Sequence, residues 1–266
     1  MKDLIYEYYN IDDFYKDVYN PTQFGDSGRS KAFLNEDEPD FRGLARDKIL
    51  KSKYGYTDGL KELKELELNV SLGGSSRKYK YDEFDGDDLN YDRLLEGFPA
   101  MRKRVKTFGI GSGRLVNIYV VISENCCISY REMVNKAHTA IRIIDLLERM
   151  GYRTAVWACD STDDPSGSYN NEKGVHYECK ICLKRFEDSL NKPLILNGIS
   201  PWFFRYFMFA HQSGHYMAGF GLGHSVKMKL EQTKENIVIN NGECLSKESS
   251  DKKIKEIEKL FEIETN

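Results

Sequence analysis

The chain has 266 residues and nearly balanced charges, 39 Lys and Arg against 42 Asp and Glu, for a formal net charge of -3 at pH 7. Its length suffices for one large buried core, its charge disfavours a protein that coats nucleic acid, and no apolar run reaches the roughly 20 residues of a membrane span. The N-terminus lacks the features of a secretory signal. We therefore expect a cytoplasmic protein, without a membrane partner, whose six cysteines are reduced and unpaired.

The first 75 residues are predicted to form a helical N-terminal segment. Seven aromatic residues among the first 24 indicate a packed chain, because disordered tails are poor in aromatic residues. We expect a short helix over residues 13–19, a polar connector over 25–40 and a helical hairpin over about 41–70. The GGSS sequence at residues 73–76 is typical of a flexible joint, so we place a domain boundary near residue 75.

An α/β domain is predicted over residues 76–266, because the spacing of apolar residues changes beyond the joint. The continuous apolar run at 115–122 is typical of a strand buried on both faces. Ser129 is a suitable cap for the next helix, whose apolar residues keep helical spacing up to Gly151. A second buried strand is predicted over 153–159. Strand, long helix and strand together indicate a crossover unit with parallel strands.

The rest of the domain is predicted from shorter patterns. Residues 160–173 are polar and acidic, and we expect an exposed, mobile loop there. Alternating apolar residues predict a third strand over 175–183, and the aromatic segment 202–210 is predicted to be a core helix. A short strand over 236–239 and a terminal helix over 250–262 follow. These elements predict an α/β fold with a Rossmann-like layered sheet.

The segment VNIYVVISENCCISYREMVNKAHTAIRIIDLLERMGYRTAVWACDS contains a strand, a loop, an alanine-bearing helix and a Leu-Glu-x-x-Gly-Tyr exit at residues 147–152. It resembles the opening of a von Willebrand factor A-type domain, most closely the divergent domain of cobaltochelatase-like proteins. A broader resemblance, through residues 41–43, 55–63, 95–101 and 201–211, points to an uncharacterised family of bacteriophage and actinobacterial mobile-element proteins. The resemblance implies a von Willebrand A-like domain of phage origin with no known activity.

The chain departs from the A-type pattern at the metal site of that family. The family carries Asp-x-Ser-x-Ser after the first strand, because a carboxylate and two hydroxyls supply oxygen ligands to a divalent cation. The matching residues here are Val121, Ser123 and Asn125, so the charged ligand is missing. The resemblance therefore does not imply metal-dependent adhesion.

A candidate site is predicted at one edge of the sheet, because open α/β sheets bind ligands beyond the carboxyl ends of their strands. The loops after the first two strands would form an acidic rim there, which Glu187 and Asp188 would extend after the third strand. Such a rim attracts a basic protein surface or a hard cation and repels nucleic-acid phosphate. The expected partner-binding residues are Ser123, Glu124, Asn125, Asp160, Thr162, Asp163 and Asp164.

Two functions are compatible with this rim. The first is a phage-type, non-enzymatic protein-interaction module without a cofactor, acting in the host cytosol or as a minor virion component. The alternative is a divalent-metal-dependent hydrolase that holds Mg²⁺ or Mn²⁺ through Asp160, Asp163 and Asp164, together with Glu124 or Glu187.

Two further motifs are interpreted as structural. Cys179-x-x-Cys182 and His211-x-x-x-His215 offer zinc-ligand types, but the alternation of a strand sends the two cysteines to opposite faces of the sheet. We therefore expect structural thiols without metal. The basic cluster at residues 102–106 is interpreted as a solvated surface.

Overall fold

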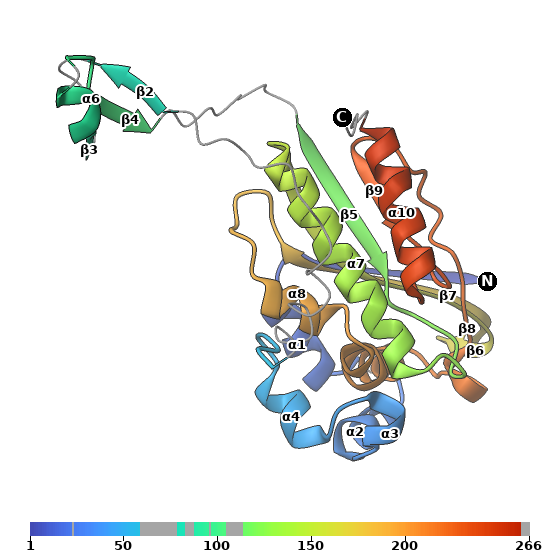
Figure 1. The fold of residues 1–266 in the computed structure, drawn as a ribbon. Helices are drawn as coiled ribbons and strands as arrows, with labels where there is room; N and C mark the ends of the chain where they lie inside the picture. Colours follow the sequence, from blue (N-terminus) through green and yellow to red (C-terminus); the bar gives the residue numbers. More distant parts are fainter. Residues whose placement is uncertain (23, 59–78, 83–87, 96, 105–113, 262–266) are drawn as a thin grey trace. The chain divides into compact units, whose positions relative to one another are not determined.

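The computed structural model describes residues 1–22, 24–58, 79–82, 88–95, 97–104 and 114–261 (Figure 1). Its contacts divide the chain into two compact units, one of Met1–Glu67 with Arg114–Asn266 and one of Leu68–Gly113. This division differs from the boundary expected near residue 75, because the N-terminal segment belongs to the same compact unit as the α/β part. Within the described part of the chain, every helix falls short of the length and apolar character needed to cross a membrane.

The first unit is built on a six-stranded, mixed sheet with the order β1-β7-β6-β5-β9, in which β8 also pairs with β6. The pairs β5 with β6, β5 with β9 and β1 with β7 are parallel, whereas β6 is antiparallel to β7 and β8. The predicted Rossmann-like layered α/β class is confirmed. The strands are β1 (Lys2–Tyr8), β5 (Leu115–Val121), β6 (Arg153–Tyr169), β7 (Glu172–Lys184), β8 (His224–Ser225) and β9 (Asn236–Ile239).

Helices pack on one face of this sheet around the main hydrophobic core. The N-terminal helices are α1 (Ile11–Tyr19), α2 (Ser27–Asn35), α3 (Pro39–Arg42) and α4 (Arg46–Lys51). The later ones are α7 (Tyr130–Arg149), α8 (Lys192–Gly198), the π-helix η1 (Phe203–Met208), α9 (Phe209–His215), the 3-10 turn η2 (Phe220–Leu222) and α10 (Lys247–Leu260). A smaller cluster around Val121 and Trp157 covers the other face.

The crossover unit β5-α7-β6 forms as predicted. Ser129 and Glu132 make a reciprocal capping box at the start of α7, which satisfies backbone donors that the first turn leaves unpaired. The predicted core position of the aromatic segment is also confirmed, since Phe203 and Phe207 are fully buried. A π-helix places these rings, rather than a regular α-helix.

The second unit contains a three-stranded antiparallel sheet with the order β2-β4-β3. Its described elements are β2 (Tyr79–Asp82), β3 (Asp88–Leu89), α6 (Tyr91–Leu95) and β4 (Met101–Arg104). The first three residues of the basic cluster, 102–104, lie on β4. The expected helix after residue 57 lies almost wholly outside the described residues.

The N-terminal segment is less helical than predicted. It opens with β1, which pairs with β7 over seven residues at the edge of the central sheet. The expected polar connector over 25–40 instead forms α2. The Asp26 side chain caps its first turn by accepting a hydrogen bond from the Arg29 N–H at 2.9 Å. A suitable cap therefore starts a helix in a segment with few apolar residues.

The prediction of an exposed loop over residues 160–173 was wrong. These residues continue β6 to Tyr169 and turn back into β7 through Asn170 and Asn171, both with positive φ. Since β7 runs antiparallel to β6, its carboxyl end lies at the opposite edge of the sheet. Glu187 and Asp188 follow that end and do not join the predicted rim.

Candidate functional site

A crevice of about 510 Å³ lies beyond the carboxyl ends of β5 and β9. Four of the seven predicted rim residues line it, namely Ser123, Glu124, Asn125 and Thr162. The other lining residues come from the loop before α7, from η1 and α9, from β8 with the glycine turn before it (Gly219, Gly221 and Gly223), and from the loop after β9. They are Cys126, Ile128, Phe204, Phe209, Gln212, Gly221, Leu222, Gly223, His224, Ser225, Asn241 and Gly242.

Hydrogen bonds hold together the three loops around this crevice. The Ser225 hydroxyl donates to the Ser123 carbonyl at 2.7 Å, and the Asn241 amide donates to the Ser225 carbonyl at 3.3 Å. The Ser161 N–H donates to the Ser123 hydroxyl at 3.2 Å. Loops from β5, β8 and β9 are thus fixed to one another, and the crevice is pre-formed, as is usual for ligand sites.

The charge of Glu124 is neutralised within the protein. Its carboxylate forms a buried ion pair with Lys136 of α7 and accepts the Gly242 N–H at 3.0 Å. The Lys136 ammonium also donates to the carbonyls of Val121 at 2.8 Å and Asn240 at 3.0 Å, so it links the ends of β5 and β9. Burial lowers the pKa of Lys136, although the charge of Glu124 acts in the opposite direction.

Asp160 lies behind the crevice and does not line it. The side chain is fully buried on the helix-covered face of β6, where Oδ1 accepts the Thr162 hydroxyl at 2.8 Å and Oδ2 has no hydrogen-bond partner. Burial raises the pKa of Asp160 to about 6, although hydrogen bonds to Thr162 and Ser123 act to lower it. A carboxyl group with a raised pKa beside a cleft is a recurrent property of functional sites.

The remaining two acids of the predicted rim are used elsewhere. Asp164 is fully buried and accepts the N–H groups of Gly167 at 2.8 Å and Gly219 at 2.7 Å, so it anchors the glycine turn. Asp163 points to the other face of the sheet and pairs with His176 at 2.6 Å. The expected acidic rim is therefore not an open row of carboxylates, because each acid has an internal partner.

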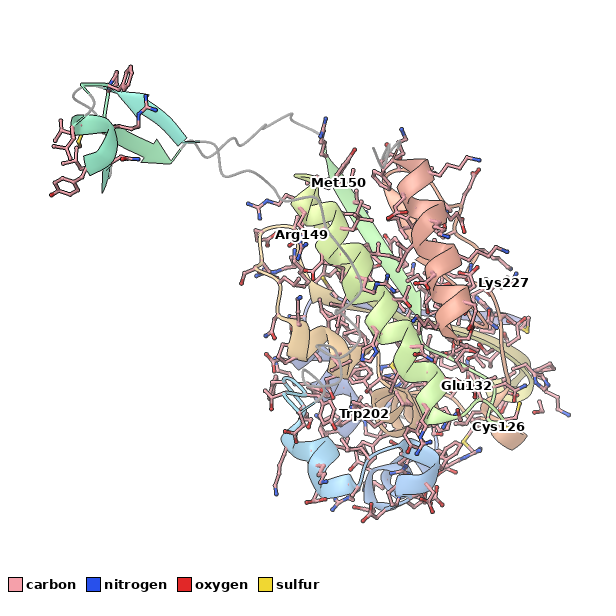
Figure 2. All side chains as sticks on the ribbon, in the orientation of Figure 1. Cys126, Glu132, Arg149, Met150, Trp202 and Lys227 are labelled. Carbon is pink, nitrogen blue, oxygen red and sulfur yellow. The ribbon has the colours of Figure 1, made fainter. Side chains whose placement is uncertain are left out.

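The crevice has an apolar floor and a polar mouth. Phe204 and Leu222 are buried against its base, whereas Asn125 and His224 are exposed at its opening. Figure 2 shows Cys126 beside the first turn of α7, close to Glu132. The Asn241 Oδ1 atom is buried without a hydrogen-bond partner, and an unpaired buried acceptor favours a ligand that donates to it.

A second cluster of polar side chains lies between α1, α9 and β1. The carboxylate of Asp17 and the rings of His211 and His215 converge there, with their ligand atoms within 4.8 Å of one another. Cys179 and Cys182, which the sequence associates with these histidines, lie in different hydrophobic clusters on opposite faces of the sheet, as predicted. The His-x-x-x-His spacing was a usable signal for this cluster, but no local pattern connects it to residue 17.

Comparison with known proteins shows which family the chain belongs to. A family model described as "Domain of unknown function (DUF7192)" matches residues 2–265, which is nearly the whole chain. Searches of curated proteins and of solved structures returned no match.

Proposed function

From the premise that the chain belongs to the family described as Domain of unknown function (DUF7192), whose description carries no activity, we propose that it is a non-enzymatic protein-interaction module. Its binding site is the crevice beyond β5 and β9. The observation that carries this proposal is a pre-formed crevice of about 510 Å³ with an apolar floor and a polar mouth. That is the usual composition of a site that takes an apolar anchor and orients it with a few hydrogen bonds.

The chemistry of the crevice favours a neutral partner group. Lys136 neutralises Glu124, so a partner does not need a positive charge to enter. An apolar side chain would pack on Phe204 and Leu222, and a donor on the partner would satisfy Asn241 Oδ1. This differs from the basic surface that an open acidic rim would attract.

The module is a degenerate von Willebrand A-like domain of phage origin. The β5-α7-β6 crossover and the crevice at its carboxyl edge support a degenerate von Willebrand A-like domain. A phage origin and a place in the host cytosol or the virion rest on the sequence resemblance alone. The alternative, a hydrolase with a metal held by Asp160, Asp163 and Asp164, has less support, because these side chains are paired internally or point to different faces.

Selection from a random-peptide display library tests the proposal, because it requires no assumption about which protein the partner is. We expect enriched peptides to share a large apolar residue and to bind the wild-type protein. Asn125→Trp would place a bulky side chain at the exposed mouth of the crevice and should abolish binding. Lys255→Trp, at an exposed position of α10 outside the crevice, should leave binding unchanged.

Two outcomes would overturn the proposal. One is the absence of any sequence-dependent enrichment on the wild-type protein. The other is enrichment that Asn125→Trp leaves intact, which would place the interaction on another surface. Circular dichroism of each variant confirms that it is folded before binding is measured.

A further inference from the structure

The geometry of Asp17, His211 and His215 matches that of metal ligands. The Asp17 Oδ2 atom lies 3.2 Å from His215 Nε2 and 3.7 Å from His211 Nε2. Two donors at roughly 2.1 Å from a tetrahedral zinc ion stand about 3.4 Å apart. The two separations bracket this value, and all three ligand atoms lie within 4.8 Å of one another, so the three side chains can hold one ion once the rings and the Tyr8 hydroxyl adjust.

His215 provides an independent indication of a ligand. Its side chain is 1% exposed, its Nδ1 lies 2.8 Å from the backbone carbonyl of His211, and its Nε2 has no hydrogen-bond partner. A carbonyl oxygen only accepts, so Nδ1 carries a proton, and in the neutral form of the ring the Nε2 lone pair faces the Asp17 carboxylate. A lone pair that faces an anion is unfavourable, and a cation between the two atoms removes the conflict.

The surroundings of the two rings are those of metal-bound histidines. Such ligands usually bind through one nitrogen while the other bonds to a protein group that fixes the ring. Here Tyr177 O–H lies 2.6 Å from His211 Nδ1, and the His211 carbonyl takes the same role for His215.

Tyr8 supplies a fourth polar group at the same point. Its hydroxyl donates to Asp17 Oδ2 and lies 2.7 Å from His211 Nε2. The ring of Tyr6 packs edge-on against His215 with 4.7 Å between centroids. The donors are therefore few and closely surrounded by aromatic rings, which favours the low coordination number of zinc over an octahedral ion.

We propose that Asp17, His211 and His215 hold one Zn²⁺ ion that ties α1 to α9. In zinc peptidases with two histidines four residues apart, a Glu beside the first histidine acts as general base. Gln212 occupies that position here, and its amide donates to the Tyr216 hydroxyl at 2.7 Å and the Leu222 carbonyl at 2.9 Å. The ion therefore has a structural role, joining the N-terminal segment to the α/β part.

Calorimetric titration of Zn²⁺ into chelator-treated protein tests this site. The exposed thiols of Cys126 and Cys127 would bind zinc independently of the proposed site. The titration therefore uses a background protein in which both are replaced, Cys126→Ser and Cys127→Ser. We expect one ion per chain and a rise in Tm on saturation. His215→Phe, which keeps a ring at this position, should weaken binding by more than about 100-fold.

A matched control and a second variant make the result decisive. His176→Phe removes a histidine that also faces a carboxylate, Asp163, but lies outside the cluster of Asp17, His211 and His215; zinc binding should be unchanged. Asp17→Asn, at a partly exposed position, should weaken binding even if His215→Phe misfolds. The proposal fails if the background protein binds no zinc, or if both site variants bind it as tightly as the background does.

Discussion

The crevice and the histidine cluster place their charged groups in opposite ways. Around the crevice, Glu124 and Lys136 are both buried and form an ion pair. Backbone carbonyls accept further hydrogen bonds from Lys136, and a backbone N–H donates to Glu124. In the histidine cluster, the buried His215 Nε2 makes no hydrogen bond, although Asp17 Oδ2 lies 3.2 Å away. A buried charge with a full set of partners maintains structure, whereas a buried polar atom without one indicates a ligand.

The same comparison holds within the crevice itself. Its charged residues face one another beneath the surface, and its unpaired acceptor, Asn241 Oδ1, belongs to a neutral side chain. The crevice therefore suits a neutral donor, while the cluster of Asp17, His211 and His215 suits a cation. The crevice charges should therefore stabilise the fold without a ligand, whereas the cluster should stabilise it fully only with a bound cation.

The largest effect is expected from Lys136→Met. This substitution leaves the Glu124 carboxylate buried without its counter-ion. It also removes the hydrogen bonds that the Val121 and Asn240 carbonyls accept from Lys136. Breaking a buried ion pair by removing one partner costs about 3–5 kcal/mol of the free energy of unfolding. Urea denaturation at pH 7 measures this cost.

The control for this prediction is an exposed ion pair. Lys16→Met removes the partner of Asp13 on the outer face of α1, where such pairs contribute about 0–1 kcal/mol. A loss from Lys136→Met no larger than that from Lys16→Met would show that the crevice charges are dispensable to the fold.

A pH-dependent effect is expected from Asp160. Its pKa is raised to about 6 by burial, above the value of about 3.9 for an unfolded chain. The native state then binds more protons than the unfolded state between pH 4 and 6, so this group makes stability fall as pH rises through that window. The shift of about two units corresponds to roughly 3 kcal/mol.

Asp160→Asn isolates this contribution. The variant cannot ionise at this position, so the difference in unfolding free energy between variant and wild type should change by about 2–3 kcal/mol from pH 4 to pH 7, in favour of the variant. Urea denaturation at several pH values measures it, because other titrating groups cancel in the difference. A constant difference over this range would mean that the Asp160 carboxyl ionises as it does in water.

The sequence predicts the parts of the fold that depend on apolar spacing. The run at 115–122, the helix that Ser129 caps and the start of the strand at Arg153 form as expected, because their burial follows from local patterns. The extension of β6 beyond Asp160 was missed, since its buried polar side chains look like those of a loop. Their partners, such as Gly219 for Asp164, are distant in the sequence.

The candidate sites were predictable to different degrees. The edge of the sheet that holds the crevice follows from the crossover rule, and Ser123 to Asn125 line the crevice there. The partners of the acids there were not predictable, because Lys136 lies on a helix where lysine normally faces solvent. The meeting of Asp17 with His211 requires β1 to join the sheet beside β7, and no local pattern indicated that strand.

A smaller effect is expected from His215→Phe when zinc is absent. Phenylalanine keeps the stacking with His211, whose ring lies 3.9 Å away, and the edge contact with Tyr6. The main loss is the hydrogen bond to the His211 carbonyl, worth about 1 kcal/mol. Denaturation in the presence of a chelator measures it. A cost as large as that of Lys136→Met would show that His215 is charged and paired with Asp17, with no need for a cation.

The smallest effect is expected from Asp163→Asn. Asp163 belongs to the predicted rim, yet it is partly exposed on the other face of the sheet and pairs with His176. Asparagine keeps a carbonyl oxygen that can accept a hydrogen bond from the His176 ring, so the loss should stay below the roughly 1 kcal/mol of one such bond, by urea denaturation at pH 7. The variant should also keep the peptide binding that Asn125→Trp abolishes, since Asp163 does not line the crevice. Loss of that binding in a folded Asp163→Asn protein would move the interaction surface to the face of the sheet that carries His176.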